Sequence, residues 1–248
     1  MSSMIINLGN RVVNNYLVDS KVGYILIDTG YDGSFPRFVK GLEKRHIAPD
    51  EIKYVFLTHA HDDHAGFLNE VLAVTDAKVI LHPKAIEGLK RGQNSFEGGC
   101  SSRLAYLFCK LLALFGHGEH RYPPIRDVFL DRLIPIDSDR FRSLGFPYEI
   151  LETPGHTADH ISLLAGDKLF CGDAAMNGFP SRRRTIIWIE NPAVQEILGR
   201  DPAKSPRHAL PRTRQALQNL GPPEIPEEPG ADQTVPAQIG MNSWKPEQ

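Results

Sequence analysis

Long apolar runs, a secretion signal and paired cysteines are all missing from this sequence of 248 residues. No run approaches the roughly 18 apolar residues that a membrane-spanning helix needs. Residues 1–10 have neither the basic start nor the apolar stretch of a signal peptide. The 3 cysteines have unrelated spacings, which excludes a disulfide framework or a zinc ribbon. We therefore expect a cytoplasmic protein without a membrane span.

A strong charge of one sign is absent as well. The 28 Lys and Arg residues nearly balance the 30 Asp and Glu residues, so the net charge is −2. This balance gives no electrostatic reason to expect binding to nucleic acid or to an anionic membrane. A small molecule is the expected partner, and the oligomeric state is left open. The length suits one layered domain with a sizeable core.

Short strands and helices alternate through residues 1–191, which we expect to form one domain. Period-two and compact apolar runs predict strands at 4–8, 15–19, 24–28, 54–58, 78–82, 148–152, 160–164 and 168–171. Helical spacing predicts helices at 34–46, 67–72 and 83–91. Polar motifs follow several of the strands, so the chemistry is expected at their C-terminal ends.

Residues 92–130 interrupt this alternation as an insert. Its apolar stretch from Arg103 to Phe115 is too short to span a bilayer. A buried helix is the simplest interpretation. A lid that presents an apolar wall to substrate and a helix on a membrane surface are the alternatives.

Residues 192–248 differ from the rest of the chain in composition. They hold more than half of the 19 prolines and show almost no sustained helix or strand period. This composition predicts a disordered or non-native tail.

A dense group of metal-binding side chains follows the apolar run at 54–58. The segment reads HAHDDH and contains His59, His61, Asp63 and His64. Imidazole and carboxylate ligands suit zinc, iron or manganese, and the lack of cysteine argues against a structural zinc site. The alternative is a helix N-terminus capped by Asp. A capped helix end would not explain why three histidines stand within these six residues.

Two later segments each add one ligand type. His156 stands in the turn sequence PGHT, and Asp173 follows Gly172 after an apolar strand. Each is weak evidence alone, because histidine and Gly-Asp are common in turns. In this order and at these separations the three segments reinforce one another.

Together these motifs resemble the metallo-β-lactamase superfamily, whose pattern is HxHxDH, then His, then Asp, and then one more His. The Asp-Thr-Gly at 28–30 also matches, and the resemblance covers about residues 4–191. It implies an α+β fold, an αββα sandwich with metals at one edge. The family binds two zinc ions per chain, and iron or manganese is the alternative.

The resemblance also implies a role for each ligand. His59, His61 and His156 would hold the first metal. Asp63 and His64 would hold the second, and Asp173 would bridge the two. The resemblance leaves His160 as a supporting or structural residue, and His82, His117 and His120 have no motif support as ligands.

The implied chemistry is hydrolysis. Two cations lower the pKa of a water molecule and yield a metal-bound hydroxide near pH 7. Asp63 would be the catalytic residue that orients this nucleophile and accepts its proton, and Asp62 is expected to orient the imidazoles. We expect a metal-dependent hydrolase of a small ester, thioester, lactone or lactam. An iron-dependent redox relative, similar to a persulfide dioxygenase, is an alternative.

The last histidine of the family pattern is missing. It normally stands in a YPxHG-like segment some tens of residues after Asp173, and the only later histidine is His208 in SPRHALP. His208 lacks both the preceding strand and the following glycine. The last strand-helix unit is therefore expected to be missing or altered. The chain would then bind one metal, or be a non-catalytic product.

A frameshift accounts for this loss. Read one base later, the codons for Ala209 to Leu220 permit a segment containing YPAHG, and the flanking stretches permit helix-like segments. The hypothesis is that the native reading frame is left near Pro192 or Ala193. Sequencing the gene region is expected to show a YPAHG-like string in the second frame. Codons that cannot encode such a string would exclude the frameshift.

Overall fold

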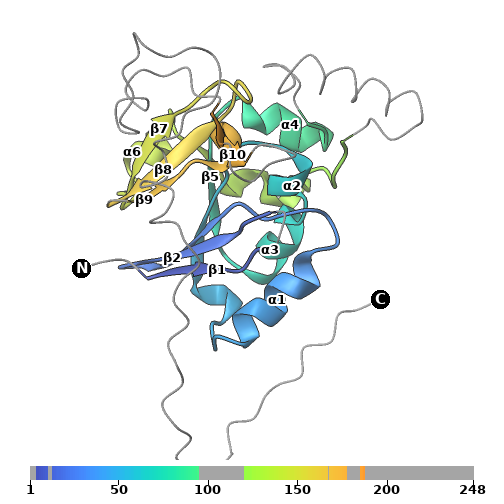
Figure 1. Ribbon diagram of the computed structural model, residues 1–248, viewed down its shortest axis with the longest axis vertical. Helices are drawn as coiled ribbons and strands as arrows, with labels where there is room; N and C mark the ends of the chain where they lie inside the picture. The colour runs from blue at the N-terminus through green and yellow to red at the C-terminus, as the bar shows by residue number, and fades with distance from the viewer. Residues whose placement is uncertain (1–3, 11–12, 95–119, 167, 178–184, 188–248) are drawn as a thin grey trace, which may run out of the picture.

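The computed structural model describes residues 4–10, 13–94, 120–166, 168–177 and 185–187. Figure 1 shows the arrangement of the elements. The strands are β1 (Ile5–Asn7), β2 (Tyr16–Ser20), β3 (Gly23–Ile27), β4 (Ile52–Phe56), β5 (Lys78–Leu81), β6 (Leu133–Pro135), β7 (Glu149–Glu152), β8 (Ile161–Ala165), β9 (Lys168–Phe170), β10 (Ala175–Asn177) and β11 (Thr185–Ile187). The helices are α1 (Phe35–Glu43), α2 (Asp62–Ala65), α3 (Leu68–Val74), α4 (Ala85–Arg91) and α6 (Asp139–Arg142), with 3-10 turns η1 (Pro49–Glu51), η2 (Asp127–Arg132) and η3 (Gly172–Ala174).

The larger sheet has six strands in chain order, β1-β2-β3-β4-β5-β6. The pairs β1–β2 and β2–β3 are antiparallel, whereas β3–β4, β4–β5 and β5–β6 are parallel. Parallel neighbours need a crossover, and α1, α3 and α4 lie in these crossovers. The parallel strands β3, β4 and β5 therefore end at one common edge.

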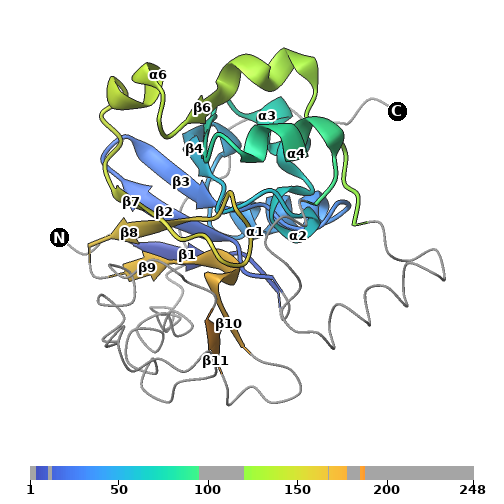
Figure 2. The same ribbon diagram turned by 90° about the horizontal axis from the view of Figure 1, so that it is seen from above.

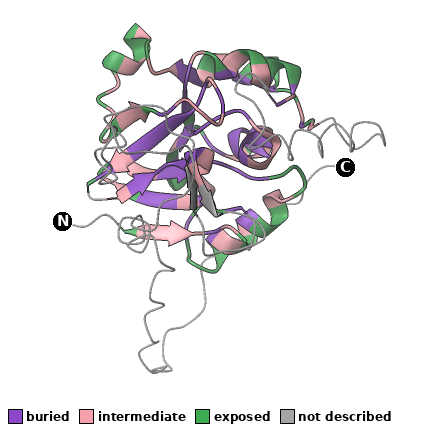
Figure 3. Cartoon of the chain, turned by 45° about the horizontal axis from the view of Figure 1, so that its top comes forward, coloured by how far each residue is buried: buried purple, intermediate pink, exposed green. Residues whose placement is uncertain are grey.

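Both faces of the larger sheet are buried. Consecutive residues of a strand point to opposite faces, so Leu17 and Val18 belong to two different apolar clusters. The cluster on one face joins the sheet to the helices through residues such as Leu26, Val55, Phe38, Leu42, Val71 and Leu72. The cluster on the other face joins it to the second sheet through Ile25, Phe56, Ile80, Ile161, Leu163 and Phe170. In Figure 3 the strands are largely buried, while the helices expose their outer faces.

The second sheet is antiparallel, with the order β7-β8-β9. Residues of this sheet pack on one face of the larger sheet, and residues of α1 to α4 pack on the other. In Figure 2 the strands of the two sheets overlap. The expected α+β class with two facing sheets is confirmed. A two-stranded ribbon of β10 and β11 follows the smaller sheet. The expected change in the last strand-helix unit concerns residues outside the described ranges.

Several elements differ from the sequence expectations. The second half of the HAHDDH segment is helical, because Asp62 begins the short helix α2, which was not among the expected helices. Strand β6, helix α6 and the β10–β11 ribbon were not expected, since each has only three or four residues and no clear period. The apolar stretch 103–115 and the tail 192–248 lie outside the described residues. Within the described ranges, no helix is both long and apolar enough to cross a membrane.

Replacing Leu163 by alanine tests the packing of the two sheets. The Leu163 side chain is completely buried in the cluster between them. The lost apolar contact and the cavity are expected to lower the free energy of unfolding by about 2–5 kcal/mol. Urea denaturation followed by circular dichroism measures this change. Val128→Ala is the control, because Val128 is 70% exposed, and equal effects of both substitutions would contradict the arrangement.

Candidate metal centre

The polar motifs meet at one edge of the sandwich because the strands that precede them end there. Asp28 follows β3, and His59 lies shortly after β4. His156 lies in the turn between β7 and β8, and Asp173 follows β9. A backbone hydrogen bond of 2.9 Å from Ile161 N to Thr58 O joins the two sheets at this edge. The fold therefore brings together segments that are about a hundred residues apart in the sequence.

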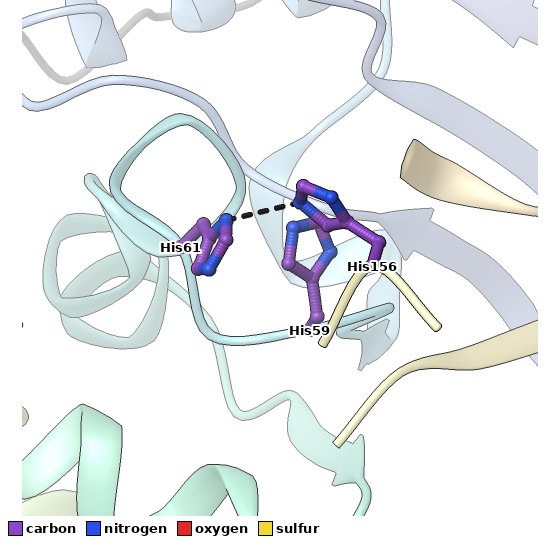
Figure 4. Close-up of side chains that lie close together, drawn as sticks. All are labelled: His59, His61 and His156. Carbon is purple, nitrogen blue, oxygen red and sulfur yellow. Dashed lines mark hydrogen bonds between the residues drawn. The ribbon is translucent and has the colours of Figure 1, made fainter. Parts of the chain in front are cut away.

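Three histidines form the first group of candidate ligands. One ring nitrogen of each of His59, His61 and His156 lies within 4.8 Å of the others. His156 Nε2 and His61 Nδ1 lie 3.2 Å apart (Figure 4). The His59 ring is completely buried, while His61 and His156 are partly exposed. A cation bound here would therefore be open to solvent on one side.

The second group contains His64 and two carboxylates. His64 Nε2 lies 3.4 Å from Asp173 Oδ1 and 3.5 Å from Asp63 Oδ2. The other oxygen of Asp173, Oδ2, lies 3.6 Å from His156 Nε2. The two oxygens of Asp173 thus face the two groups, which is the geometry that a bridging ligand needs. A ring nitrogen of His59 also lies within 4.8 Å of a ring nitrogen of His64 and of a carboxylate oxygen of Asp173.

Asp28 accepts the hydrogen bonds that support a histidine of each group, directly for His64 and through Thr58 for His59. Its Oδ1 accepts a hydrogen bond of 2.7 Å from Thr58 N. Its Oδ2 accepts bonds of 2.8 Å from Thr58 Oγ1 and from His64 Nδ1. Asp28 is buried and has a φ of 54°, a left-handed conformation that Asp tolerates better than most residues. The strained turn after β3 therefore places a carboxylate under α2.

These hydrogen bonds fix the tautomers of two histidines. The Thr58 hydroxyl has one hydrogen, which it donates to Asp28, so it accepts from His59 Nδ1 at 3.0 Å. His64 Nδ1 likewise donates to Asp28. The Nε2 atom of each neutral ring then carries a lone pair directed into the centre. Orienting a ligand through its second ring nitrogen is the usual arrangement around metal-binding histidines.

The electrostatics favour a positive charge at this point. Burial alone would lower the pKa of His64, but the nearby carboxylates of Asp28 and Asp63 raise that pKa well above its usual value. Burial also works against ionised Asp173, yet the hydrogen bond to His64 and its charge lower the pKa of Asp173 below the usual range. Carboxylate oxygens facing a histidine nitrogen are stable only with a cation between them, either a proton or a metal.

Two other histidines of the centre, His59 and His156, are held neutral. Burial, together with the neighbouring His64, lowers the pKa of His59 well below its usual value. Burial lowers the pKa of His156 to about 4. Metal ions bind the neutral imidazole. His59 and His156 can therefore bind a cation without first losing a proton near pH 7.

Unpaired buried atoms provide a test of whether the residues fit a metal. Within the described ranges, four buried side-chain nitrogen or oxygen atoms have no hydrogen-bond partner. One of them is His59 Nε2, the atom that the tautomer argument leaves with a lone pair. An unsatisfied buried acceptor is costly, and a cation at this position would satisfy it. The residues present therefore fit a divalent metal ion.

The segment that carries the histidines is held from both sides. Ala60 N donates to Asp159 Oδ2 at 2.9 Å, and Ala60 O accepts from the Tyr122 hydroxyl at 3.0 Å. Asp62 contacts Asn94 and His120, with Asn94 Nδ2 donating to its carboxylate at 2.8 Å. Asn94 and His120 flank the residues of the insert that lie outside the described ranges. The base of the insert is thus attached beside the candidate ligands.

The structure brings together all six residues that the sequence motifs singled out, although their assignment as ligands stays a prediction. The carboxylate that orients a candidate ligand histidine is Asp28, a role that the sequence reasoning assigned to Asp62. Asp28 is the first residue of the Asp-Thr-Gly motif, which the sequence analysis used only as evidence for the family resemblance. His82 contacts Glu152, and His117 and His208 lie outside the described residues.

Comparison with known proteins gives consistent matches. A family model described as the metallo-beta-lactamase superfamily matches residues 8–225. A metallo-beta-lactamase fold-containing protein of Sulfurisphaera tokodaii is 29% identical over 154 residues, which are 61% of this chain and 52% of that protein. A probable metallo-hydrolase of Bacillus subtilis is 28% identical over 156 residues, covering 62% and 56% of the two chains. A hydroxyacylglutathione hydrolase of Hahella chejuensis is 29% identical over 136 residues, covering 52% and 37%.

This chain spans less than two thirds of the length of each of these relatives. The family match continues to residue 225, past the point at 191 where the sequence analysis placed the end of the domain. That boundary stays a prediction.

Asp28→Asn tests whether the three hydrogen bonds to Asp28 support metal binding. Asparagine has the same shape and tolerates the same backbone conformation, but its amide cannot accept all three hydrogen bonds. We expect metal affinity about 10- to 100-fold weaker than in the unchanged protein. Competition titration with a chromogenic chelator measures this affinity. Asp76→Asn is the control, because Asp76 is fully exposed, and an unchanged affinity in Asp28→Asn would remove Asp28 from the centre.

Proposed function

Because the chain belongs to the metallo-β-lactamase superfamily, we propose that it is a metal-dependent hydrolase of a small ester, thioester, lactone or lactam. The match agrees with the resemblance seen in the sequence motifs. The observation that carries the proposal is the position of Asp173, whose two oxygens face His64 on one side and His156 on the other. A shared carboxylate between two ligand groups is the arrangement of a two-metal hydrolytic site.

We assign the ligands as follows. His59, His61 and His156 hold the first cation, Asp63 and His64 hold the second, and Asp173 bridges them. Imidazole and carboxylate ligands without cysteine suit zinc, with iron or manganese as alternatives. The first cation thus has three histidines, whereas the second, as assigned here, has one histidine besides the carboxylates of Asp63 and Asp173. The first site is therefore expected to bind its metal more tightly.

When bound, divalent cations polarise the substrate carbonyl and lower the pKa of a water molecule toward neutrality. Asp63 orients the attacking water and accepts its proton. Its carboxylate is largely buried beside His64, and burial raises the pKa of Asp63, which makes it a better base. Asp28 and Thr58 keep His64 and His59 in the orientation that binding needs.

The names of the relatives support hydrolysis over redox chemistry. Two of the three reported above are named as hydrolases. Hydroxyacylglutathione is an acyl thioester, so a thioester comes first among the substrates to test. An iron-dependent dioxygenase would instead contain iron and consume oxygen.

Metal content and turnover of the purified chain test the proposal. Elemental analysis gives metal per chain, and chromogenic ester, thioester, lactone and lactam substrates give activity. We expect zinc and hydrolysis of at least one class, both abolished by a chelator and restored by zinc. One equivalent of metal or less without turnover would mean a non-catalytic product.

Asp63→Asn separates the proposed base from the histidine group. The amide cannot accept a proton, so kcat is expected to fall about 10²- to 10⁴-fold. At least one metal equivalent should stay bound at His59, His61 and His156. Asp76→Asn is again the matched control. Full turnover in metal-loaded Asp63→Asn would assign the proton transfer to another group.

A further inference from the structure

His160 is a buried histidine that belongs to neither ligand group. It lies just before β8, and only 1% of its surface is exposed. Its ring stacks on the ring of His59, with centroids 4.9 Å apart and an interplanar angle of 27°. His59 packs against the other histidines at steeper angles, between 47° and 89°. One face of the His59 ring therefore packs on the His160 ring.

A chain of hydrogen bonds fixes the His160 ring. Its Nδ1 lies 2.8 Å from Thr153 Oγ1, which in turn lies 2.8 Å from Ser162 Oγ. The backbone of the same residues is paired as well, since Thr153 N donates to His160 O at 2.9 Å. All three side chains are buried. The plane of His160 is thus set by the smaller sheet.

The edge of the same ring faces the turn that carries Asp173. Gly172 has a φ of 42°, and a Cβ placed on it would lie 2.6 Å from Thr58 Oγ1 and 3.2 Å from His160 Nε2. The Gly172 backbone therefore fits between Thr58 and His160 only because it has no side chain. His160 thus stacks on the ring of His59 and occupies the space that a side chain at residue 172, just before Asp173, would enter.

We propose that His160 is a positioning residue, whose imidazole fixes the ring plane of His59 and the turn that presents Asp173. The inference rests on the proposed function, because it takes His59 and Asp173 as metal ligands. A ligand ring binds well only if its lone pair points at the cation, so a support that prevents ring rotation strengthens binding. His59 has such a support on two sides, from Thr58 at its Nδ1 and from His160 on its face.

Three variants test this role. His160→Leu fills the space but removes the flat, hydrogen-bonded ring. His160→Phe keeps a flat ring without the bond to Thr153. Thr153→Val removes that bond and leaves His160 in place. The control is Leu42→Ala in α1, which loses buried surface on the far side of the larger sheet.

The probe is Co²⁺, added to the metal-free full-length chain. Its dissociation constant and its visible absorption spectrum report the ligand geometry without any turnover. Urea denaturation of the metal-free proteins gives their stability. Since an aromatic pair contributes up to about a tenfold change in an equilibrium constant, we expect His160→Leu to bind Co²⁺ about tenfold more weakly, with a changed spectrum. His160→Phe should recover most of the affinity.

The outcomes are distinct. Wild-type affinity and spectrum in His160→Leu would overturn the inference and leave His160 as a core residue. A loss no larger than that in an equally destabilised Leu42→Ala would do the same. If His160→Leu does not fold, an unchanged spectrum in Thr153→Val overturns the inference instead. A wild-type chain that binds no Co²⁺ would refute the proposed metal site itself, whatever the variants do.

Discussion

The buried carboxylate of Asp28 is the constraint on which the candidate centre depends. Three hydrogen bonds reach it from the backbone and hydroxyl of Thr58 and from the ring of His64. They join the ends of β3 and β4 to helix α2, and they direct two imidazole lone pairs into the same space. The carboxylate is stable in this buried position because all of these groups donate to it. The orientation of the candidate ligands His59 and His64 follows from that arrangement.

The packing of the two sheets supplies the other half of the centre. Apolar residues on one face of the larger sheet pack against the smaller sheet and hold it at a fixed distance from β4. The turns after β7 and β9 then place His156 and Asp173 opposite the histidine segment. The hydrogen bond from Ile161 N to Thr58 O aligns the two sheets at this edge. Sheet packing, rather than any local sequence, therefore sets the distance between the histidine segment 59–64 and the two candidate ligands His156 and Asp173.

Buried residues contact the candidate ligands, and further buried residues contact those in turn. Thr58 contacts Asp28 and His59, and His160 stacks on His59 while Thr153 holds His160. Each of these residues is buried, so each bond forms in a medium of low polarity, where it is stronger than in water. The ligands are thus held in position before any cation binds.

The sequence by itself determined the family, the strand-helix alternation and the six candidate ligands, because metal-binding side chains in HAHDDH have no role in packing. It did not distinguish Asp28 from Asp62 as the supporting carboxylate, nor give a role to Thr58 or His160. Elements as short as α2 and β6 were missed because they contain too few residues to show a period. Only the tertiary structure decided these points, since hydrogen bonds such as that between Asp28 and His64 join residues 36 positions apart, and the meeting of distant segments is set by sheet packing.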